Sequence, residues 1–498
     1  YTLVTRIYKN DTGELIDETE DTFGFRTFRF DSEKGFILND RQIKLKGVCS
    51  HQDFGITGKA VPDNIYEYRI DLIKEMGANA YRTSHYPHAE ATMDALDKKG
   101  ILVMDETRWY ESTDEGISQL ETLIKRDRNH PSVILWSIGN EEPKHGTEQG
   151  RRIARNMIAT LRRLDSSRPV TTAVSSDPIN STVLDLVDVI GVNYNIEQYD
   201  DIHRLYPDKP FVSTECCATA TTRGSYLDPS AFTSSYDIDV NAWFLGREKT
   251  WKFMCDREWV SGSFQWIAFE HRGECVWPRL CSVSGAIDLY LQKKDAFYQN
   301  KSHWSDTPMV HILPHWNHKG LESEPIKVWV YTNCDEVELF LNEKSLGAQK
   351  IERFGHGEWI VDYEPGGIRA IGRNGGKKCA EEFIETTGEP VALELIPENT
   401  VKQANGRDIL LFSCVCVDSS GREVPDAEPT VRFETNSFGR VIGTGANICD
   451  HIPPQCTERR MKSGRCTVAV QVGETAGALK VYAISNGLKT AVVTTNLK

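Results

Sequence analysis

The chain has 498 residues, of which 39% are hydrophobic and 26% charged, and its formal net charge at pH 7 is -14. This length is sufficient for several hydrophobic cores, so more than one domain is expected. The acidic balance argues against nucleic acid or an anionic membrane as the main partner, because both attract basic surfaces, and it favours an uncharged or small substrate.

Neither a membrane span nor a signal peptide is predicted. No run approaches the roughly 18 consecutive apolar residues that a membrane helix requires, and the first residues, YTLVTRIYKNDTGE, contain no apolar signal core. A soluble, cytoplasmic protein is expected, with the periplasm or the medium as the alternative if a leader stood upstream. The 13 cysteines form no Cys-x-x-Cys motif, so reduced thiols and no zinc site are expected. A disulfide among Cys449, Cys456 and Cys466 stays open.

The first 36 residues predict β structure. Residues 1–8 alternate between polar and apolar side chains, a turn is expected at Asn10–Gly13, and Phe23–Arg26 is predicted to be a further strand. These strands are too few to close a sandwich. Residues 1–36 are therefore expected to be the end of a β domain that begins upstream.

From residue 37 to residue 305 the pattern becomes strand, loop, helix, repeated. One helix is expected from Ile65 to Met76, opened by Pro62-Asp63 and closed by Gly77, and another from Ala89 to Lys98. The predicted strands are Ile43–Val48, Ala78–Arg82, Ile101–Met104, Val133–Ile138, Pro169–Ala173, Val187–Val192, Phe211–Thr214 and Gly262–Trp266. This alternation predicts a (β/α)8 TIM barrel with active-site residues at the strand C-termini.

Beyond the barrel the helical period disappears. Alternating β ribbons are predicted at Lys327–Tyr331 and Val337–Leu341, the second followed by a turn at Asn342–Lys344. Two β-sandwich domains are therefore expected, at residues 306–388 and 389–498. The whole fold class is thus a multidomain protein, with a TIM barrel flanked by β domains.

Chemically active side chains follow nearly every predicted barrel strand. They are His51, Arg82, His85, Glu106, Asn140, Glu141, Tyr194, Glu215 and Trp266. A strand buried on both faces is apolar along its body, and polar groups project into a pocket where the strand leaves the barrel. Glu141 and Glu215 follow the fourth and seventh strands. Two carboxylates facing across a barrel mouth suit glycoside cleavage, in which one donates a proton to the leaving oxygen and the other supports positive charge at the sugar carbon.

The same residues also have structural interpretations. A single glutamate at a strand end is often a helix N-cap or a surface ion pair, and His85, Tyr194 and Trp266 could simply pack under loops or in the core. Glu106 beside Arg82 is interpreted as an ion pair that orients the catalytic groups without reacting. No histidine motif activates the two cysteines that follow Glu215, so a cysteine hydrolase is not expected.

Five stretches in barrel order carry a resemblance to a known family. They are GVCSHQDFG (Gly47–Gly55), ANAYRTSHYPH (Ala78–His88), GILVMDETRW (Gly100–Trp109), NHPSVILWSIGNEE (Asn129–Glu142) and STECC (Ser213–Cys217). They resemble the barrel motifs of family 2 glycoside hydrolases, most closely the bacterial β-galactosidase-type branch with extra C-terminal β domains. The resemblance implies Glu141 as general acid/base and Glu215 as nucleophile of a retaining mechanism. It also implies sugar contacts from His51, His85, Asn140, Tyr194 and Trp266.

The sequence departs from the family pattern in ways that bear on domains and metals. Family members begin with a jelly-roll domain and an immunoglobulin-like domain, and residues 1–36 resemble only the end of the second. Magnesium-using β-galactosidases have a histidine two places after the glutamate that matches Glu106, where this chain has Arg108. We therefore expect no metal and no cofactor.

Sugar specificity is predicted from the segments after the eighth strand. Family β-glucuronidases carry Asn-x-Lys there to hold the uronate carboxylate, and Leu280–Gly285 has neither residue, which favours a neutral sugar. Arg272 and Arg279 lie close by, and either could bind a carboxylate. Arg279 is therefore a candidate substrate-binding residue, and Glu270–Glu274, which departs from the usual Asp-Tyr version of this loop, also bears on specificity.

The sequence thus predicts a retaining exo-β-glycosidase that hydrolyses terminal β-galactosides, alone or as a homo-oligomer. A β-glucuronidase of the same family and a truncated, inactive carbohydrate-binding relative are the alternatives. The intact pair Glu141 and Glu215 favours an enzyme, because a binding protein does not need both carboxylates. A carbohydrate is the expected partner, with no nucleic acid and no membrane, and the C-terminal sandwiches are expected to be structural supports.

Overall fold

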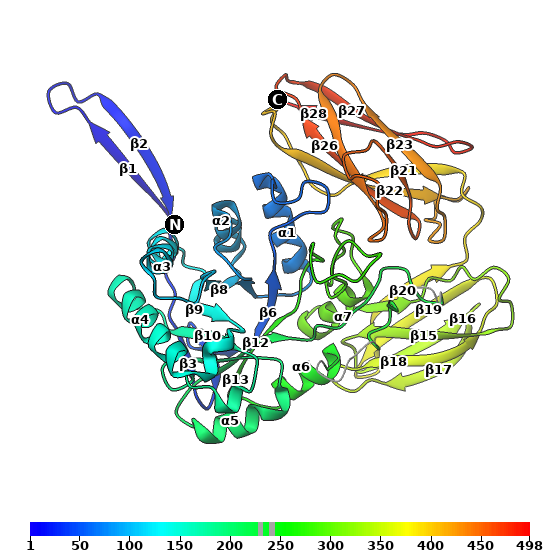
Figure 1. Ribbon diagram of the computed structural model, residues 1–498. Helices are drawn as coiled ribbons and strands as arrows, with labels where there is room; N and C mark the ends of the chain where they lie inside the picture. The colour runs from blue at the N-terminus through cyan, green and yellow to red at the C-terminus, as the bar shows by residue number, and fades with distance from the viewer. Residues whose placement is uncertain (228–232, 239–244) are drawn as a thin grey trace. The chain divides into compact units, whose positions relative to one another are not determined.

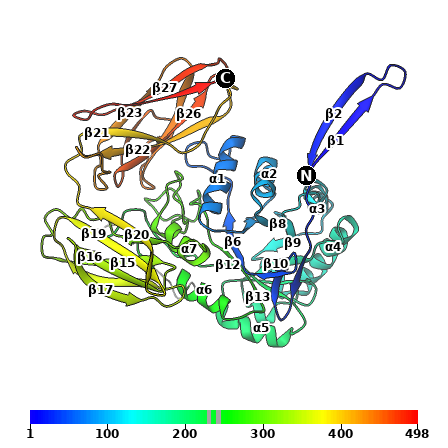
Figure 2. The ribbon, with the colours of Figure 1, turned by 180° about the vertical axis from the view of Figure 1, so that it is seen from behind.

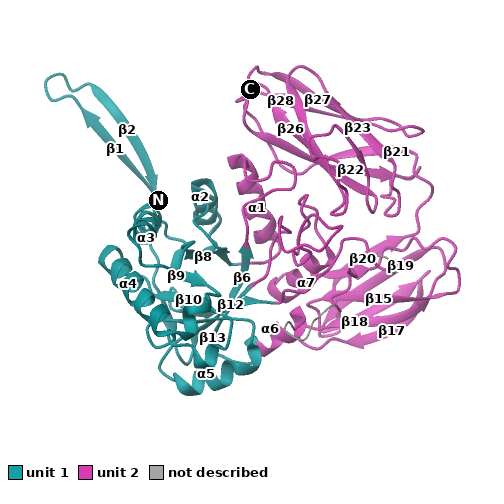
Figure 3. Ribbon diagram, viewed as in Figure 1, with its two compact units in different colours: residues 1–49, 79–216, 254–264 teal, residues 50–78, 217–253, 265–498 magenta. Residues whose placement is uncertain are grey.

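The computed structural model describes residues 1–227, 233–238 and 245–498 (Figure 1). It contains two compact units (Figure 3). Unit 1 consists of residues 1–49, 79–216 and 254–264, and unit 2 of residues 50–78, 217–253 and 265–498. No helix among the described residues is long and apolar enough to cross a membrane. None of the 13 cysteines, all of which lie in described residues, is in a disulfide, including Cys449, Cys456 and Cys466.

Eight parallel strands close into a barrel, as the sequence predicts. The strands are β6 (Leu45–Ser50), β7 (Ala80–Thr83), β8 (Leu102–Glu106), β9 (Val133–Asn140), β10 (Val170–Val174), β11 (Ile190–Asn193), β12 (Phe211–Cys216) and β13 (Val260–Gln265). Their order around the barrel is β10-β11-β12-β13-β6-β7-β8-β9. The prediction of a TIM barrel is therefore confirmed.

The described chain contains seven α-helices, and the first two are those that the caps and the periodic pattern predict at residues 65–76 and 89–98. The seven are α1 (Asp63–Glu75), α2 (Glu90–Lys99), α3 (Asp114–Asp127), α4 (Glu148–Leu164), α5 (Tyr199–Leu205), α6 (Arg247–Cys255) and α7 (Asp295–Trp304). The threonine side chains at Thr113 and Thr147 cap α3 and α4 by accepting hydrogen bonds from the amides of Gly116 and Gly150. These caps fix where the helices after β8 and β9 begin.

Tight packing inside the barrel explains the apolar strands. Every residue of β8, β10, β12 and β13 is buried, as a parallel barrel covered by helices requires. Gly47 in β6 lies so close to β13 that a Cβ atom at this position would come 2.5 Å from the ring of Phe264. A residue larger than glycine at position 47 would push these two strands apart.

An exposed hairpin forms the beginning of the chain. It pairs β1 (Thr2–Tyr8) with β2 (Leu15–Thr22), every residue of both strands is exposed, and in both views it extends away from the rest of unit 1 (Figures 1 and 2). The strand predicted at Phe23–Arg26 is absent, so that prediction is wrong. Phe23 and Phe25 instead pack against Tyr1, with ring centroids 5.6 Å and 5.5 Å away. An aromatic cluster, rather than strand pairing, explains the apolar side chains here.

A small three-stranded sheet follows in unit 1, formed by β3 (Phe28–Asp31), β4 (Gly35–Leu38) and β5 (Arg41–Ile43). The domain boundary expected between residues 36 and 37 would fall inside β4. The expected domain boundaries all remain predictions.

Two pairs of antiparallel sheets follow the barrel in unit 2. In the first pair, β14 (Val310–Leu313), β15 (Pro325–Thr332) and β18 (His356–Asp362) face the sheet β17 (Lys344–Lys350), β16 (Glu336–Leu341), β19 (Gly367–Asn374) and β20 (Lys377–Glu385). Residues from both sheets share one core, which includes Val328, Trp359 and Leu339. This is the packing of a β sandwich.

The second pair repeats this arrangement with four strands in each sheet. One sheet contains β21 (Ala392–Pro397), β22 (Ile409–Val417), β26 (Arg465–Val472) and β24 (Gly439–Gly445), and the other β25 (Glu458–Arg460), β23 (Thr430–Thr435), β27 (Gly477–Ile484) and β28 (Ala491–Leu497). Phe412, Phe433 and Leu479 belong to their common core. The β ribbons predicted after the barrel are confirmed.

Candidate active site

Most of the predicted site residues in unit 1 lie at the C-terminal ends of barrel strands. Glu106 ends β8, Asn140 ends β9 and is followed by Glu141, Glu215 lies near the end of β12, and Tyr194 follows β11. Arg82 lies within β7, and His85 comes two residues after that strand. Because the strands of a closed parallel barrel all end at the same rim, these side chains gather at one place.

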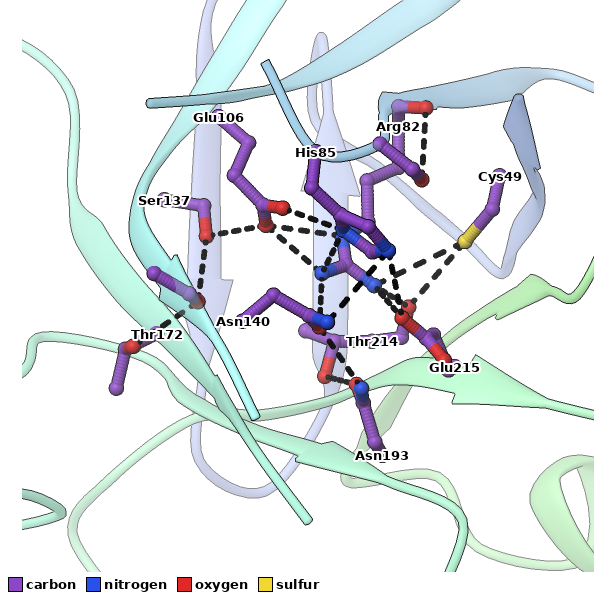
Figure 4. A network of polar contacts seen from close by, with 12 residues as sticks. Cys49, Arg82, His85, Glu106, Ser137, Asn140, Thr172, Asn193, Thr214 and Glu215 are labelled. Atoms are coloured by element: carbon purple, nitrogen blue, oxygen red, sulfur yellow. Dashed lines mark hydrogen bonds and ion pairs between the residues drawn. The ribbon is translucent and has the colours of Figure 1, made fainter. Parts of the chain in front are cut away.

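Arg82 is the centre of this group (Figure 4). Its guanidinium donates to Glu106 Oε2 from Nη2 at 2.8 Å and to Glu215 Oε1 from Nη1 at 2.8 Å. Nη2 also donates to Asn140 Oδ1 at 2.7 Å. The Arg82 and Glu106 side chains are fully buried, and Glu215 is nearly so. One buried cation therefore holds two carboxylates and an amide at fixed positions.

His85 lies between the same two carboxylates. Its Nδ1 is 2.8 Å from Glu106 Oε1 and its Nε2 is 3.7 Å from Glu215 Oε1. The Ser137 hydroxyl donates to Glu106 Oε2 at 2.7 Å. Both oxygens of Glu106 are thus occupied by protein groups, which leaves this carboxylate to orient its neighbours.

The environments of Glu106 and Glu215 shift their pKa values in opposite directions. Burial opposes ionisation of Glu106, but the Arg82 charge and the hydrogen bond from His85 lower its pKa to about 2. Burial raises the pKa of Glu215, and the negative charge of Glu141 adds to this, against the lowering effects of Arg82, His85 and the Tyr194 hydroxyl. Glu106 therefore stays ionised. Glu215 is less readily ionised, because burial and the charge of Glu141 outweigh the groups that stabilise its anion.

Glu141 is exposed, and its carboxylate is held from one side. Asn193 Nδ2 donates to Glu141 Oε1 at 2.9 Å and to Asn140 Oδ1 at 3.0 Å. The Thr214 hydroxyl donates to Asn193 Oδ1 at 2.6 Å, which fixes which end of the amide is the donor. Asn193 thus connects Glu141 to the network around Arg82.

Asn193 and Thr214 are functional candidates that the sequence prediction does not contain. Thr214 is the last residue of the predicted strand Phe211–Thr214, and Asn193 directly follows the predicted strand Val187–Val192. Asn193 is the last residue of β11, directly before Tyr194, and that position is the signal that could have identified it.

A residue with left-handed backbone directly follows two of these strands, β9 and β11. The backbone φ angles of Glu141 and Tyr194 are both 53°. Residues other than glycine rarely adopt such angles, and those that do concentrate at functional sites. The backbone at these two residues is held by hydrogen bonds to the next strand. Glu141 N donates to the carbonyl oxygen of Ala173 and Tyr194 N to that of Glu215, each at 2.8 Å.

The remaining predicted residues lie in unit 2. The His51 ring is 5.5 Å from the Trp266 ring and 4.3 Å from the His271 ring. The Trp266 indole donates to Glu274 Oε2 at 3.1 Å, and only 4% of Trp266 is exposed. The structure thus brings His51 and Trp266 together in one aromatic group, and their contacts with sugar remain predictions.

The two arginines considered for a carboxylate differ in their contacts. Arg272 Nη2 donates to the carbonyl oxygen of Gly55 at 2.7 Å. Arg279 is half-buried, and its Nε donates over a long 3.5 Å to the carbonyl oxygen of Val276. In the loop Glu270–Glu274, Glu270 forms a buried ion pair of 2.8 Å with Lys294, so its role is structural.

A magnesium ion at Glu106 does not fit the residues present. Both carboxylate oxygens already accept hydrogen bonds, and the Arg108 guanidinium lies 4.5 Å from the Trp109 ring centroid in the loop that follows Glu106. The Arg82 guanidinium, whose Nη2 is 2.8 Å from Glu106 Oε2, would oppose the charge of Mg²⁺. Among residues 1–227, 233–238 and 245–498, no group of three or more His, Cys, Asp or Glu side chains is placed to hold a metal.

A parallel barrel with paired carboxylates at its C-terminal rim defines the class of glycoside hydrolase catalytic domains. The family profile "Glycosyl hydrolases family 2, TIM barrel domain" matches residues 31–244, and "Glycoside hydrolase family 2 C-terminal domain 5" matches residues 393–494. Residues 323–380 match a domain of unknown function, DUF4982. The chain belongs to family 2 of the glycoside hydrolases.

Individual relatives are similar over nearly the whole chain. The β-galactosidase BoGH2A of Bacteroides ovatus is 33% identical over 99% of this chain and 66% of its own length. A β-glucuronidase of Formosa agariphila is 28% identical over 99% of this chain and 52% of its own length. A solved β-glycosidase from Bacteroides vulgatus has a TM-score of 0.89 at 32% identity, covering 100% of this chain and 69% of that one. The chain thus spans between half and two thirds of the length of the first two relatives.

Proposed function

We propose that the protein is a retaining exo-β-glycosidase that hydrolyses terminal β-galactosides. The observation that carries this proposal is the contrast between two carboxylates in one network. Glu215 is buried against Arg82, and Glu141 is exposed and held by Asn193. A nucleophile must be shielded from water and precisely oriented, whereas a general acid/base must exchange its proton with water between turnovers.

The reaction proceeds in two displacements. Glu215 attacks the anomeric carbon while Glu141 donates a proton to the departing oxygen, which gives a glycosyl-enzyme intermediate. Glu141 then removes a proton from the water that releases the sugar. Arg82 and the Tyr194 hydroxyl, both hydrogen-bonded to Glu215, orient its carboxylate and take up part of its returning charge.

Asn140 is placed to recognise the sugar. Its Oδ1 accepts from both Arg82 and Asn193, so Nδ2 is the donor end of the amide, and it has a long 3.5 Å contact with His85 Nε2. We assign to Nδ2 a hydrogen bond to the 2-hydroxyl group, an interaction that strengthens in the transition state. Trp266 and His51 are assigned to the apolar face of the ring.

A neutral sugar is favoured over a uronate. Leu280–Gly285 lacks the Asn-x-Lys of β-glucuronidases, and the guanidinium of Arg272 is engaged by Gly55. Of the two named relatives that cover 99% of the chain, the β-galactosidase is 33% identical and the β-glucuronidase 28%. One observation favours the alternative, a β-glucuronidase. In the described part of the chain, the sole hydrogen bond of the Arg279 side chain is its 3.5 Å contact with Val276, so its guanidinium can still receive a carboxylate.

Hydrolysis of chromogenic β-galactoside and β-glucuronide, measured side by side, tests these alternatives. The galactoside is expected to be cleaved with a kcat/KM at least about tenfold higher, because Leu280–Gly285 lacks the lysine of the Asn-x-Lys motif that would hold a uronate carboxylate. Arg279→Ala is expected to leave galactoside cleavage within about twofold, since a neutral sugar offers the guanidinium no carboxylate to pair with. Cleavage of glucuronide alone, lost in Arg279→Ala, would establish the uronidase. Binding of galactose without any cleavage would favour the carbohydrate-binding relative.

Asn193→Ala is expected to lower kcat about 10-fold to 100-fold, because Glu141 loses a hydrogen bond to its charged form. The measurement is steady-state kinetics on one chromogenic galactoside. Asn180→Ala, which removes an exposed amide that donates to Asp177, is the control and should leave kcat within about twofold. An unchanged kcat in Asn193→Ala would remove Asn193 from the mechanism.

A further inference from the structure

Two thiols approach each other in the first β sandwich. Cys334 lies in the turn between β15 and β16, and Cys379 lies in β20. Their Sγ atoms are 3.2 Å apart. A disulfide requires about 2.05 Å, so a shift of roughly 1 Å would bring the two sulfurs to bonding distance.

A β-bulge aims the side chain of Cys379. In the ladder between β19 and β20, Gly372 pairs with Ala380 and Arg373 pairs with Lys378, so Cys379 is left without a partner residue. Such an extra residue kinks its strand and redirects its side chain. The Cys379 thiol donates to the carbonyl oxygen of Gly372 at 3.4 Å, so it points across the strand pair rather than along the regular alternation.

Gly372 provides the space in which the thiols meet. A Cβ atom at this position would lie 2.6 Å from Cys334 Sγ. Cys334 itself is fixed, since its amide donates to the Thr332 hydroxyl at 3.0 Å and only 3% of the residue is exposed. The exposed Cys379 sulfur and the buried Cys334 sulfur therefore meet for three reasons: the bulge at Cys379, the absence of a side chain at Gly372, and the fixed position of Cys334 in its turn.

We propose that Cys334 and Cys379 form a dithiol site that a small-molecule disulfide oxidises to an intramolecular disulfide. The exposed Cys379 thiolate attacks one sulfur of the oxidant and displaces a thiolate, which gives a mixed disulfide. The Cys334 thiolate then attacks Cys379 Sγ and displaces the second half of the oxidant. The protein loses two electrons and two protons, and the oxidant leaves as two thiols.

The reduced pair is expected to persist until such an oxidant is present. Partial loss of solvent around the sulfur and the hydrogen bond with Cys334 raise the pKa of Cys379, although the residue as a whole is exposed. Little thiolate therefore exists at neutral pH, and the first attack should become faster as the pH increases toward that pKa. Oxidation of the dithiol by weak oxidants should therefore be slow near pH 7.

The bond would fix the edge of a sheet. β20 is the edge strand of β17-β16-β19-β20, and a disulfide would tie it to the turn that begins β16, closing the loop from β16 to β20. Cross-links that close long loops stabilise a fold by restricting its unfolded chain. The proposal does not depend on the function proposed for the barrel.

The test uses the whole chain incubated with oxidised glutathione at pH 8.5, denatured in acid, alkylated, digested and analysed by mass spectrometry. The expected result is a peptide containing Cys334 linked to one containing Cys379, lighter by two hydrogens and separated by dithiothreitol. The midpoint of thermal unfolding should rise by about 5 °C or more in the oxidised protein. Cys275→Ser, which removes another exposed cysteine, should keep both effects, and Cys379→Ser should lose them.

Three outcomes would overturn the proposal. They are a lasting glutathione adduct on Cys379 with Cys334 still alkylated, a dimer linked through Cys379, and full alkylation of both residues. The linked peptide is sought in the unsubstituted protein, so this readout does not depend on whether Cys379→Ser folds.

Discussion

Replacing Glu215 with glutamine is expected to reduce kcat for a β-galactoside at least about 10⁴-fold, because the amide cannot form the covalent intermediate. The fold should survive the change. The amide oxygen of glutamine can still accept from Arg82, and the buried cation keeps its ion pair with Glu106. Activity is measured with a chromogenic galactoside, and folding by the midpoint of thermal unfolding.

Glu142→Gln is the matched control for this variant. Glu142 is also a glutamate near a strand end, but it is half-buried beside Glu141 and is not among the hydrogen-bond partners of Arg82 in the described chain. It should retain activity within about threefold, as substitutions away from the reacting groups usually do. If Glu215→Gln were as active as Glu142→Gln, a carboxylate other than Glu215 would have to be the nucleophile.

Replacing Glu141 with glutamine is expected to have an effect that depends on the leaving group. For a substrate with a poor leaving group, such as methyl β-galactoside, kcat/KM should fall about 10³-fold or more, because no acid protonates the departing oxygen. For a dinitrophenyl galactoside, whose leaving group needs no proton, kcat/KM should change by less than about tenfold. Steady-state kinetics on the two substrates measure this difference.

A second readout separates the acid from the base role of Glu141. Azide can attack the glycosyl-enzyme without a general base, so it should accelerate turnover of the dinitrophenyl substrate in Glu141→Gln and yield galactosyl azide. Azide should not change the unsubstituted enzyme. Equal losses on both substrates, with no effect of azide, would assign Glu141 to binding and leave the acid to another group.

The barrel could be predicted from the sequence because each of its strands is a short apolar run with a turn or a helix on either side. Burial on both faces imposes that pattern locally, so Val133–Ile138 and Phe211–Thr214 were recognisable without any contact information. Phe23–Arg26 was misread for the converse reason. Phe23 and Phe25 contact the ring of Tyr1 instead of pairing as a strand. This contact joins residues that are distant in the chain, so a local pattern does not reveal it.

The polar residues at the predicted strand ends include most of the side chains that meet around Arg82. They could be identified because the end of an apolar strand is visible in the local sequence. The same pattern could have identified the position of Asn193, the last residue of β11, but not its role. That role lies in two hydrogen bonds to residues more than 50 positions away, and no local pattern encodes them. The catalytic and sugar-binding roles remain predictions, as do the domain boundaries.

The left-handed backbone at Glu141 has a consequence for engineering this protein. Glycine adopts a φ of 53° at no steric cost, and asparagine tolerates it better than glutamate does. Selection for heat resistance alone would therefore favour these residues at position 141 and discard the carboxylate. A campaign to make the protein more robust must score turnover alongside melting temperature, since at this position the two criteria reward different amino acids.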